Sequence, residues 1–396
     1  MESLKTLFKT GNGPSSSHTM GPKRAAQIYL SRNPEARDFR VTLYGSLAAT
    51  GRGHMTDRAI LDVLQRAGQV EIVWKPEVTL PFHPNGMLFE AAGCTPWEVF
   101  SIGGGSLSAP GFEEEAAARV YGMTTLGEIK QWCEQNGSSY WEYVEQCEGP
   151  EIWGFIARVW ETMEASVARG LEAEGTLPGG LGVRRKAADY LIRASGYSGT
   201  MRSRGMVYAY ALAVAEENAA GGEIVAAPTC GSCGILPAVL HHLMQTREFH
   251  MQRLYRAIAV AGLFGNVVRT NASISGAEVG CQGEVGVACA MAAAAACQLF
   301  GGSPAQIEYA AEMGLEHHLG LTCDPVCGMV QIPCIERNAF AAARALDANT
   351  YSTFSDGIHR VSFDKVVEVM GRTGHDLPSL YKETSEGGLA KVIKPV

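Results

Sequence analysis

The chain has 396 residues, enough for two or three domains and a large buried core. Apolar residues make up 46% and charged residues 19%, and 33 Lys and Arg against 41 Asp and Glu give a net charge of −8. This acidic balance argues against a nucleic-acid partner, because phosphate backbones are bound by an excess of positive charge. The 46 glycines follow no collagen-like period and indicate many tight turns.

Neither the N-terminus nor the rest of the chain carries a membrane or export signal. Residues 1–13 contain two lysines and no apolar run of the secretory type. The longest uncharged stretch, 285–302, consists mostly of small residues and contains Gln298, which indicates a buried helix rather than a membrane span. We therefore expect a cytoplasmic protein without a membrane partner, whose eleven cysteines are thiols, metal ligands or cluster ligands rather than disulfides.

The first part of the chain alternates short β-rich runs with helical segments. Pro22 is expected at the first position of a helix, where proline is common, and Asp57 stands at the start of a second predicted helix, 57–67. Residues 41–44 and 70–74 predict strands. This alternation predicts an α/β domain, for which we expect residues 1–148.

From residue 149 onward, apolar residues recur at helical spacing, beginning with Ile152, Ile156, Val159, Met163 and Val167. We expect a mostly α-helical catalytic domain over 149–396 and an α+β protein overall. Further helices are predicted at 201–219, 234–245, 252–263, 285–300, 304–313, 335–346 and 363–370.

A serine-rich loop, 11–22, places hydroxyl groups and the imidazole of His18 directly before the first helix. Hydroxyls and the N–H groups of a helix start together suit a carboxylate ligand. An N-cap and turn would explain any single serine equally well, but the embedded histidine favours a binding loop. The hydroxyl groups are those of Ser15, Ser16, Ser17 and Thr19.

A second loop, 43–57, follows a predicted strand and precedes a predicted helix, where α/β domains usually bind ligands. It contains His54, which is a candidate general base, although a lone loop histidine is more often an ordinary surface residue. His83 and Asn85 lie in a nearby turn and add a weaker pair of an imidazole and an amide.

Three cysteines of the helical part, Cys281, Cys323 and Cys334, lie in Gly- or Pro-containing loops before predicted helices. Backbone N–H groups in such loops can donate to thiolates or inorganic sulfides. Their separations of 42 and 11 residues fit neither zinc ribbons nor ferredoxins. Either the three loops converge on one metal centre, or the thiols are small buried apolar groups.

Other cysteines fit the second interpretation better. Cys289 and Cys297 lie inside the alanine-rich helical stretch and are expected to be buried apolar groups. Cys230 and Cys233 form a C-x-x-C motif, but the first half of a thioredoxin-like βαβ unit is missing before it. We therefore favour a loop that cradles substrate over redox chemistry.

At these residues the sequence resembles the bacterial iron–sulfur L-serine dehydratases, nearly from end to end. The resemblance implies a β-type domain followed by a helical α-type catalytic domain. It further implies an oxygen-sensitive [4Fe–4S] cluster held by Cys281, Cys323 and Cys334, and the conversion of L-serine to pyruvate and ammonia without pyridoxal phosphate. The similar motifs are Pro14–Thr19, Gly53–Asp57, Ser275–Ala288, Glu316–Asn338 and Tyr381–Leu389.

The sequence departs from the family pattern in two places. Some relatives carry a C-terminal cysteine that folds back onto the open iron, whereas this sequence ends in residues 393–396 without one, so we expect no such self-inhibiting tail. Where many relatives have glycine after Asp-Pro-Val, this chain has Cys327, for which a ligand role and a neutral role both remain open.

The resemblance also implies roles for the polar loops. An open cluster iron would bind the serine hydroxyl, and the site would lie where the two domains meet. We expect His54, or else His18, to take the α-proton. The residues expected to hold the carboxylate or ammonium group are Ser15, Ser16, Ser17, Thr19 and Asn85, assisted by Asn271 and Ser273.

Two alternatives remain at this stage. One is a related lyase that acts on L-threonine or L-cysteine, because one methyl group or one sulfur atom changes the free energy of the pocket contacts by only ~1–3 kcal/mol. A non-catalytic amino-acid sensor would use the serine-rich loop without turnover. A homodimer is expected from the frequency of such assemblies alone.

Overall fold

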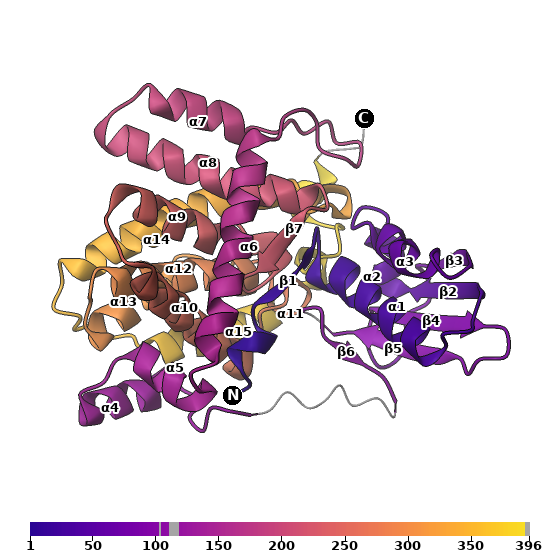
Figure 1. Cartoon of the computed structure of the whole chain (residues 1–396), viewed down its shortest axis with the longest axis horizontal. Coiled ribbons are helices and arrows are strands. Elements are labelled where there is room, and N and C mark those ends of the chain that lie inside the picture. The colour runs from indigo at the N-terminus through magenta and orange to yellow at the C-terminus, as the bar shows by residue number, and fades with distance from the viewer. Residues whose placement is uncertain (103, 111–118, 393–396) are drawn as a thin grey trace.

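The computed structural model of the chain describes residues 1–102, 104–110 and 119–392. The terminal residues 393–396, which bear on the expected absence of a tail, lie outside this range. A large helical body and a smaller α/β part lie side by side (Figure 1). The α+β architecture expected from the sequence is therefore confirmed.

The α/β part is built on one five-stranded sheet with the strand order β3-β2-β4-β5-β6. β2 and β3 run parallel, while the other neighbouring strands run antiparallel. The helices α1, α2 and α3 belong to the same part (Figure 1). The elements are α1 (Gly21–Arg32), β2 (Asp38–Tyr44), α2 (Gly45–Thr50), α3 (Thr56–Leu64), β3 (Gln69–Lys75), β4 (Gly86–Ala91), β5 (Trp97–Ser101) and β6 (Leu107–Ser108).

The helical body is organised around α12 (Val287–Leu299), which is buried on nearly all sides. Its alanines allow neighbouring helices to approach closely, and α9, α10, α13 and α14 all pack against it. No helix in the described ranges combines the length and apolar character needed to cross a membrane. The surrounding helices are α6 (Ile152–Glu172), α8 (Gly199–Ala219), α9 (Ile235–Thr246), α10 (Met251–Asn271), α13 (Pro304–Glu316), α14 (Cys334–Thr353) and α15 (Phe363–Asp376).

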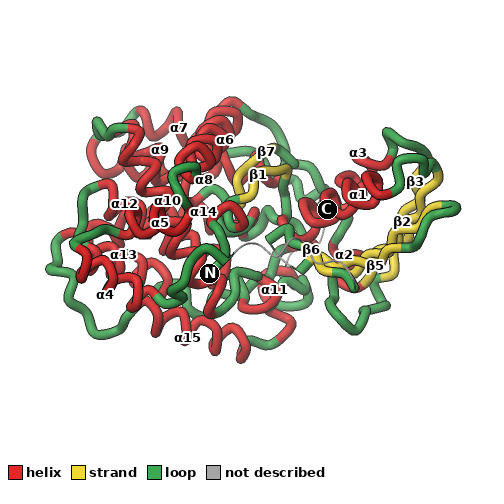
Figure 2. The backbone as a smooth tube through the Cα atoms, turned by 60° about the horizontal axis from the view of Figure 1, so that its bottom comes forward, coloured by secondary structure: helices red, strands yellow, loops and turns green. Residues whose placement is uncertain are grey.

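The N-terminal segment packs with the helical body rather than with the sheet. β1 (Lys9–Asn12) pairs antiparallel with β7 (Glu223–Ala226), and Figure 2 shows this small ribbon within the helical body. The amino group of Met1 donates a hydrogen bond of 2.6 Å to the carbonyl oxygen of Tyr121. The chain thus crosses from the helical body into the α/β part along β1, directly before the serine-rich loop.

Buried side chains form two cores that do not divide the chain at residue 148. The helices α4 (Leu126–Asn136) and α5 (Tyr140–Glu148) bury side chains in the larger, helical core. The smaller core holds buried residues from Ala25 to Ala109, around the sheet. α4 and α5 are short helices whose apolar side chains pack against the helical body, so they belong to the larger core. That residues 1–148 form one domain stays a prediction.

Candidate functional site

Two of the three candidate ligands approach one another around a carboxylate. Single ligand atoms of Cys281, Glu284 and Cys323 all lie within 4.8 Å of each other. The Sγ atoms of Cys281 and Cys323 lie 3.7 and 3.8 Å from Oε2 of Glu284. Cys323 and Cys334 line one small cavity of about 30 Å³, which Glu284 also borders. Three loops far apart in the sequence therefore meet at one point.

Each thiol is fixed by local backbone structure. Cys281 precedes a short π-helical segment, Gln282–Gly286, that continues into α12, and its carbonyl oxygen accepts hydrogen bonds from the following turn. Such segments are often found at functional sites. Cys334 is the first residue of α14. Cys323 is held by the C-terminal segment, because its N–H donates to Tyr381 and its carbonyl accepts from Glu383, both at 2.8 Å.

The site gathers groups that can carry negative charge. The hydrogen bond with Cys281, burial and the nearby Glu284 carboxylate raise the pKa of the Cys323 thiol well above its ordinary value. Burial also raises the pKa of Glu284, although Thr229 donates a hydrogen bond of 2.8 Å to this carboxylate. Arg337 is the positive group that interacts with Cys281 and Cys334. A cationic centre would relieve this crowding of thiols and carboxylates.

The residues present fit an iron–sulfur cluster. Three thiols from three loops are the donor set that leaves one iron of a cubane without a protein ligand. Gly276 keeps the space beside them open, since a Cβ there would lie 2.6 Å from Oε2 of Glu284 and 3.1 Å from Sγ of Cys323. The described residues that line the cavity do not include Cys327, Cys230 or Cys233.

His54 lines this cavity, and one of its ring nitrogens has no hydrogen-bond partner among the described residues. The side chain is fully buried, and burial lowers the pKa of His54 to about 4. Its Nδ1 lies 3.2 Å from the carbonyl oxygen of Thr50, which can only accept, so Nδ1 carries the proton. The lone pair of Nε2 has no partner among the described residues. A neutral imidazole with a free basic nitrogen therefore lies at the site.

His18 is buried beside His54 but uses both ring nitrogens. Burial and the neighbouring His54 lower the pKa of His18 well below its ordinary value. Its Nδ1 lies 3.0 Å from the Ser17 hydroxyl, and its Nε2 lies 3.1 Å from the Ser46 hydroxyl. The ring of His18 is thus held in place by hydroxyl groups, which leaves His54 as the histidine with a free nitrogen.

Two crossed hydrogen bonds join the loops that carry the histidines. The Thr19 hydroxyl donates to the carbonyl oxygen of His54 at 2.7 Å, and the Thr56 hydroxyl donates to the carbonyl oxygen of His18 at 2.5 Å. Thr19 does not itself line the cavity. It therefore acts on the site through the backbone of His54.

The serine-rich loop lines the cavity. Ser15, Ser16 and Ser17 border the same space as His54 and Cys323. The hydroxyl of Ser15 accepts a hydrogen bond from the N–H of His18 at 3.1 Å, which caps the following helical turn. Hydroxyl groups and thiols from the two halves of the chain thus face one cavity.

Three other expected substrate contacts lie away from this cavity. Asn85 is buried, donates to the carbonyl oxygen of Ser101 at 3.2 Å and does not line the cavity. Asn271 donates to the carbonyl oxygen of Thr124 at 2.7 Å, at the end of α10. Ser273 lines an adjoining cavity instead. Their expected contact with substrate stays a prediction.

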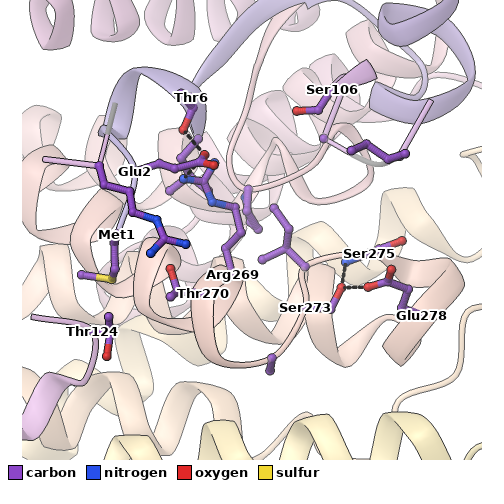
Figure 3. A pocket seen from close by; sticks show the side chains of 17 residues that line it. Met1, Glu2, Thr6, Ser106, Thr124, Arg269, Thr270, Ser273, Ser275 and Glu278 are labelled. Atoms are coloured by element: carbon purple, nitrogen blue, oxygen red, sulfur yellow. Dashed lines mark hydrogen bonds and ion pairs between the residues drawn. The ribbon is translucent and has the colours of Figure 1, made fainter. Parts of the chain in front are cut away.

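The adjoining cavity is much larger, at about 600 Å³ (Figure 3). It shares Gly104, Ile274 and Ser275 with the cavity of the thiols. In Figure 3, Ser273 is hydrogen-bonded to Glu278 and to the backbone of Ser275. Ile274 and Ser275 therefore border both spaces.

Sequence reasoning missed several residues of this site. Glu284 stands three positions after Cys281, but nothing in the sequence marks its carboxylate as a site residue except that it lies within the Ser275–Ala288 motif. Glu383 lines the cavity from the Tyr381–Leu389 motif, and burial followed by repulsion from Glu284 raises its pKa to about 8. Its positive φ of 59°, which an L-residue rarely adopts, becomes visible only in the structure.

Two family models match the chain. One is described as serine dehydratase beta chain and matches residues 3–69, and the other is described as serine dehydratase alpha chain and matches residues 109–390. The chain carries the beta-type region first and the alpha-type region second, in one polypeptide. It belongs to the serine dehydratase family, as the resemblance in the sequence implies.

Curated relatives extend this similarity over the whole length. The L-serine dehydratase of Streptomyces coelicolor is 41% identical, with 98% of both chains covered. The L-serine dehydratase 1 of Escherichia coli is 42% identical, over 98% of this chain and 99% of the relative. The L-serine dehydratase of Helicobacter pylori is 33% identical over 99% of each chain.

Proposed function

We propose that this chain is an iron–sulfur-dependent L-serine dehydratase that converts L-serine to pyruvate and ammonia. The observation that carries the proposal is the one cavity that Cys323, Cys334 and the buried His54 line together. Relatives at about 40% identity that are named L-serine dehydratase support the choice of substrate.

Cys281, Cys323 and Cys334 are the residues that would hold a [4Fe–4S] cluster. When bound, the cluster supplies a Lewis-acidic iron with an open position, which favours departure of the substrate hydroxyl group. Arg337 supports this centre from outside, since it interacts electrostatically with Cys281 and Cys334 and forms an ion pair of 3.2 Å with Asp324.

His54 is the group that removes the proton from Cα of serine. A base must be unprotonated before reaction, and burial ensures this state at neutral pH. The proton on Nδ1 donates to the carbonyl oxygen of Thr50, so the free Nε2 receives the substrate proton. As the Cα–H and Cβ–O bonds break, water is lost and 2-aminoacrylate is released, which tautomerises and hydrolyses to pyruvate and ammonia.

Ser15, Ser16 and Ser17 hold the carboxylate of the substrate. Their hydroxyl groups border the cavity, and the loop opens directly into a helical segment whose first N–H groups favour an anion. Because this loop also carries His18, which packs on His54, substrate binding and the position of the base depend on the same segment.

The test is an anaerobic assay of the protein reconstituted with iron and sulfide. We expect absorption near ~400 nm and formation of pyruvate from L-serine, both lost together in air. L-threonine and L-cysteine are assayed in parallel. A cluster without turnover of L-serine would contradict the substrate, and turnover by iron-free protein would contradict the dependence on a cluster.

A further inference from the structure

Glu383 brings a second carboxylate to the cavity of the thiols. Its side chain lines this cavity together with His54 and Cys334. Within the described ranges, no hydrogen bond or ion pair engages its carboxylate, and the charged neighbour that acts on it is Glu284, which repels it. Two carboxylates therefore border one small space, and that of Glu383 has no partner among the described residues.

Backbone contacts hold Glu383 in this place. Its N–H donates a hydrogen bond of 2.8 Å to the carbonyl oxygen of Cys323, and the Ser385 hydroxyl donates at 2.8 Å to the carbonyl oxygen of Pro325. Glu383 and Ser385 have positive φ angles of 59° and 57°, which are unfavourable for residues with a Cβ. A glycine at 383 would adopt this angle freely, and strained residues of this kind cluster at ligand-binding sites. The strain is consistent with a requirement for the glutamate side chain itself.

Glu284 serves the thiols rather than the rest of the cavity. Its carboxylate accepts a hydrogen bond of 2.8 Å from the Thr229 hydroxyl, and its Oε2 lies 3.7 and 3.8 Å from Sγ of Cys281 and Cys323. Glu284 and Glu383 are the two acidic residues among the described residues that line the cavity. Glu383 is therefore the carboxylate that remains available to a bound molecule.

An amino acid brings two charged groups into this cavity. In the proposed function, residues 15–17 hold its carboxylate group, which leaves the α-ammonium group. A buried ammonium group needs an acceptor, and a carboxylate is the strongest acceptor that a side chain offers. An ammonium group would also relieve the repulsion between Glu383 and Glu284. A hydroxyl group in its place brings no charge and leaves this repulsion uncompensated.

We propose that Glu383 binds the α-ammonium group of the substrate and makes the site select an amino acid over the corresponding hydroxy acid. This role rests on the proposed function, because it takes L-serine as the substrate. Glu383 contributes binding and selectivity, whereas the proton transfer belongs to His54. The selectivity arises because a hydroxy acid leaves the Glu383 carboxylate without its cationic partner.

The first arm of the test compares L-serine with L-glycerate, which carries a hydroxyl group in place of the ammonium group. Glu383→Gln keeps the size of the side chain and removes its charge. We expect the KM for L-serine to rise at least about 10-fold, the usual weight of one charge-assisted hydrogen bond, and kcat to stay within about 3-fold. The Ki of L-glycerate as a competitive inhibitor should be nearly unchanged. Neither KM nor Ki depends on the fraction of folded protein, so partial misfolding does not imitate this result.

The second arm measures binding without turnover, by calorimetry of the anaerobic protein reconstituted with iron and sulfide. L-alanine and L-lactate both lack the leaving hydroxyl group, and only L-alanine carries the ammonium group. We expect the unmodified protein to bind L-alanine at least about 10-fold more tightly than L-lactate, and Glu383→Gln to lose this preference. Glu383→Asp keeps the charge and should retain part of the preference.

The matched control is Glu386→Gln, which removes an exposed carboxylate from the same segment and should leave the KM and the preference unchanged. An unchanged KM and preference in Glu383→Gln would overturn the proposal. Loss of the cluster in this variant would also overturn it, because Glu383 would then belong to the metal centre.

The binding arm separates this proposal from the proposed function. No preference of the unmodified protein for L-alanine over L-lactate would overturn the role of Glu383, whatever the turnover of L-serine. A preference that depends on Glu383, in a protein that does not turn over L-serine, would support the binding role and contradict only the proposed function.

Discussion

The imidazole rings of His18 and His54 lie 4.4 Å apart, tilted by 34°, where the serine-rich loop meets the loop after α2. Both rings are buried, and no carboxylate is within hydrogen-bonding distance of either ring among the described contacts. A proton on one ring would repel a proton on the other. The pair is therefore stable only as two neutral imidazoles, which is the state that a general base needs.

The first prediction concerns stability against pH. An unfolded histidine titrates near 6.5, whereas burial lowers the pKa of folded His54 to about 4. The contribution of His54 to stability is therefore fully present above pH 6.5 and is lost as the pH drops towards 4, because the unfolded chain takes up a proton that folded His54 does not. The difference is about 3 kcal/mol for this residue.

Anaerobic denaturant titrations at several pH values measure this slope. His54→Gln removes one titrating group and should reduce the dependence between pH 6.5 and 4, while buried His18, whose pKa is also lowered, continues to contribute. His317→Gln, which changes an exposed histidine, should keep the original slope. The same slope in all three proteins would show that His54 is not the source.

The second prediction concerns catalysis. His54→Ala should lower kcat by about 10²–10⁴-fold, the usual contribution of a positioned base. The cluster spectrum should persist, because His54 is not among the proposed cluster ligands. His317→Ala serves as the matched control with normal kcat. Full activity of His54→Ala would move the role of base to His18 or to another group.

The third prediction concerns the segment that covers Cys323. Asp324 is buried, pairs with Arg337 and accepts a hydrogen bond of 2.7 Å from the N–H of Leu389. Asp324→Ala leaves Arg337 and this N–H without their partner, which costs about 2–5 kcal/mol. We expect a lower Tm and faster loss of iron, since Cys323 is held by the same C-terminal segment.

Thermal unfolding and the rate of iron release to a chelator measure the two effects. Asp376→Ala changes an exposed carboxylate at the end of α15 and is the control. If Asp324→Ala matches the unmodified protein in both assays, the segment does not depend on this anchor.

The helices were largely predictable because their buried faces repeat every three to four residues. The predicted helix at 304–313 is observed as α13, and that at 335–346 as α14. α14 runs on to Thr353, beyond the predicted end, because two buried positions of its last turns are the polar Asn349 and Ser352, so the apolar period stops earlier than the helix. The ribbon of β1 and β7 escaped prediction, because pairing between residues about 210 positions apart leaves no local pattern.

Of the site, the sequence indicated the loops better than the individual contacts. Ser15, Ser16, Ser17, His54, Cys323 and Cys334 line one cavity, and the roles expected of them stay predictions. Asn85 and Asn271 instead hold backbone carbonyls, a role that an amide plays as readily as ligand binding. Glu383 and Thr229 could not be assigned, because their positions depend on long-range packing.

The most direct test of the account is to replace each of four buried cysteines by alanine and to measure iron, sulfide and pyruvate formation under anaerobic conditions. Cys281→Ala, Cys323→Ala and Cys334→Ala should lose the cluster, about four iron and four sulfide per chain, and all turnover of L-serine. Cys289→Ala, which alters a buried thiol inside α12, should keep both. A full cluster with normal pyruvate formation in Cys323→Ala would contradict the account.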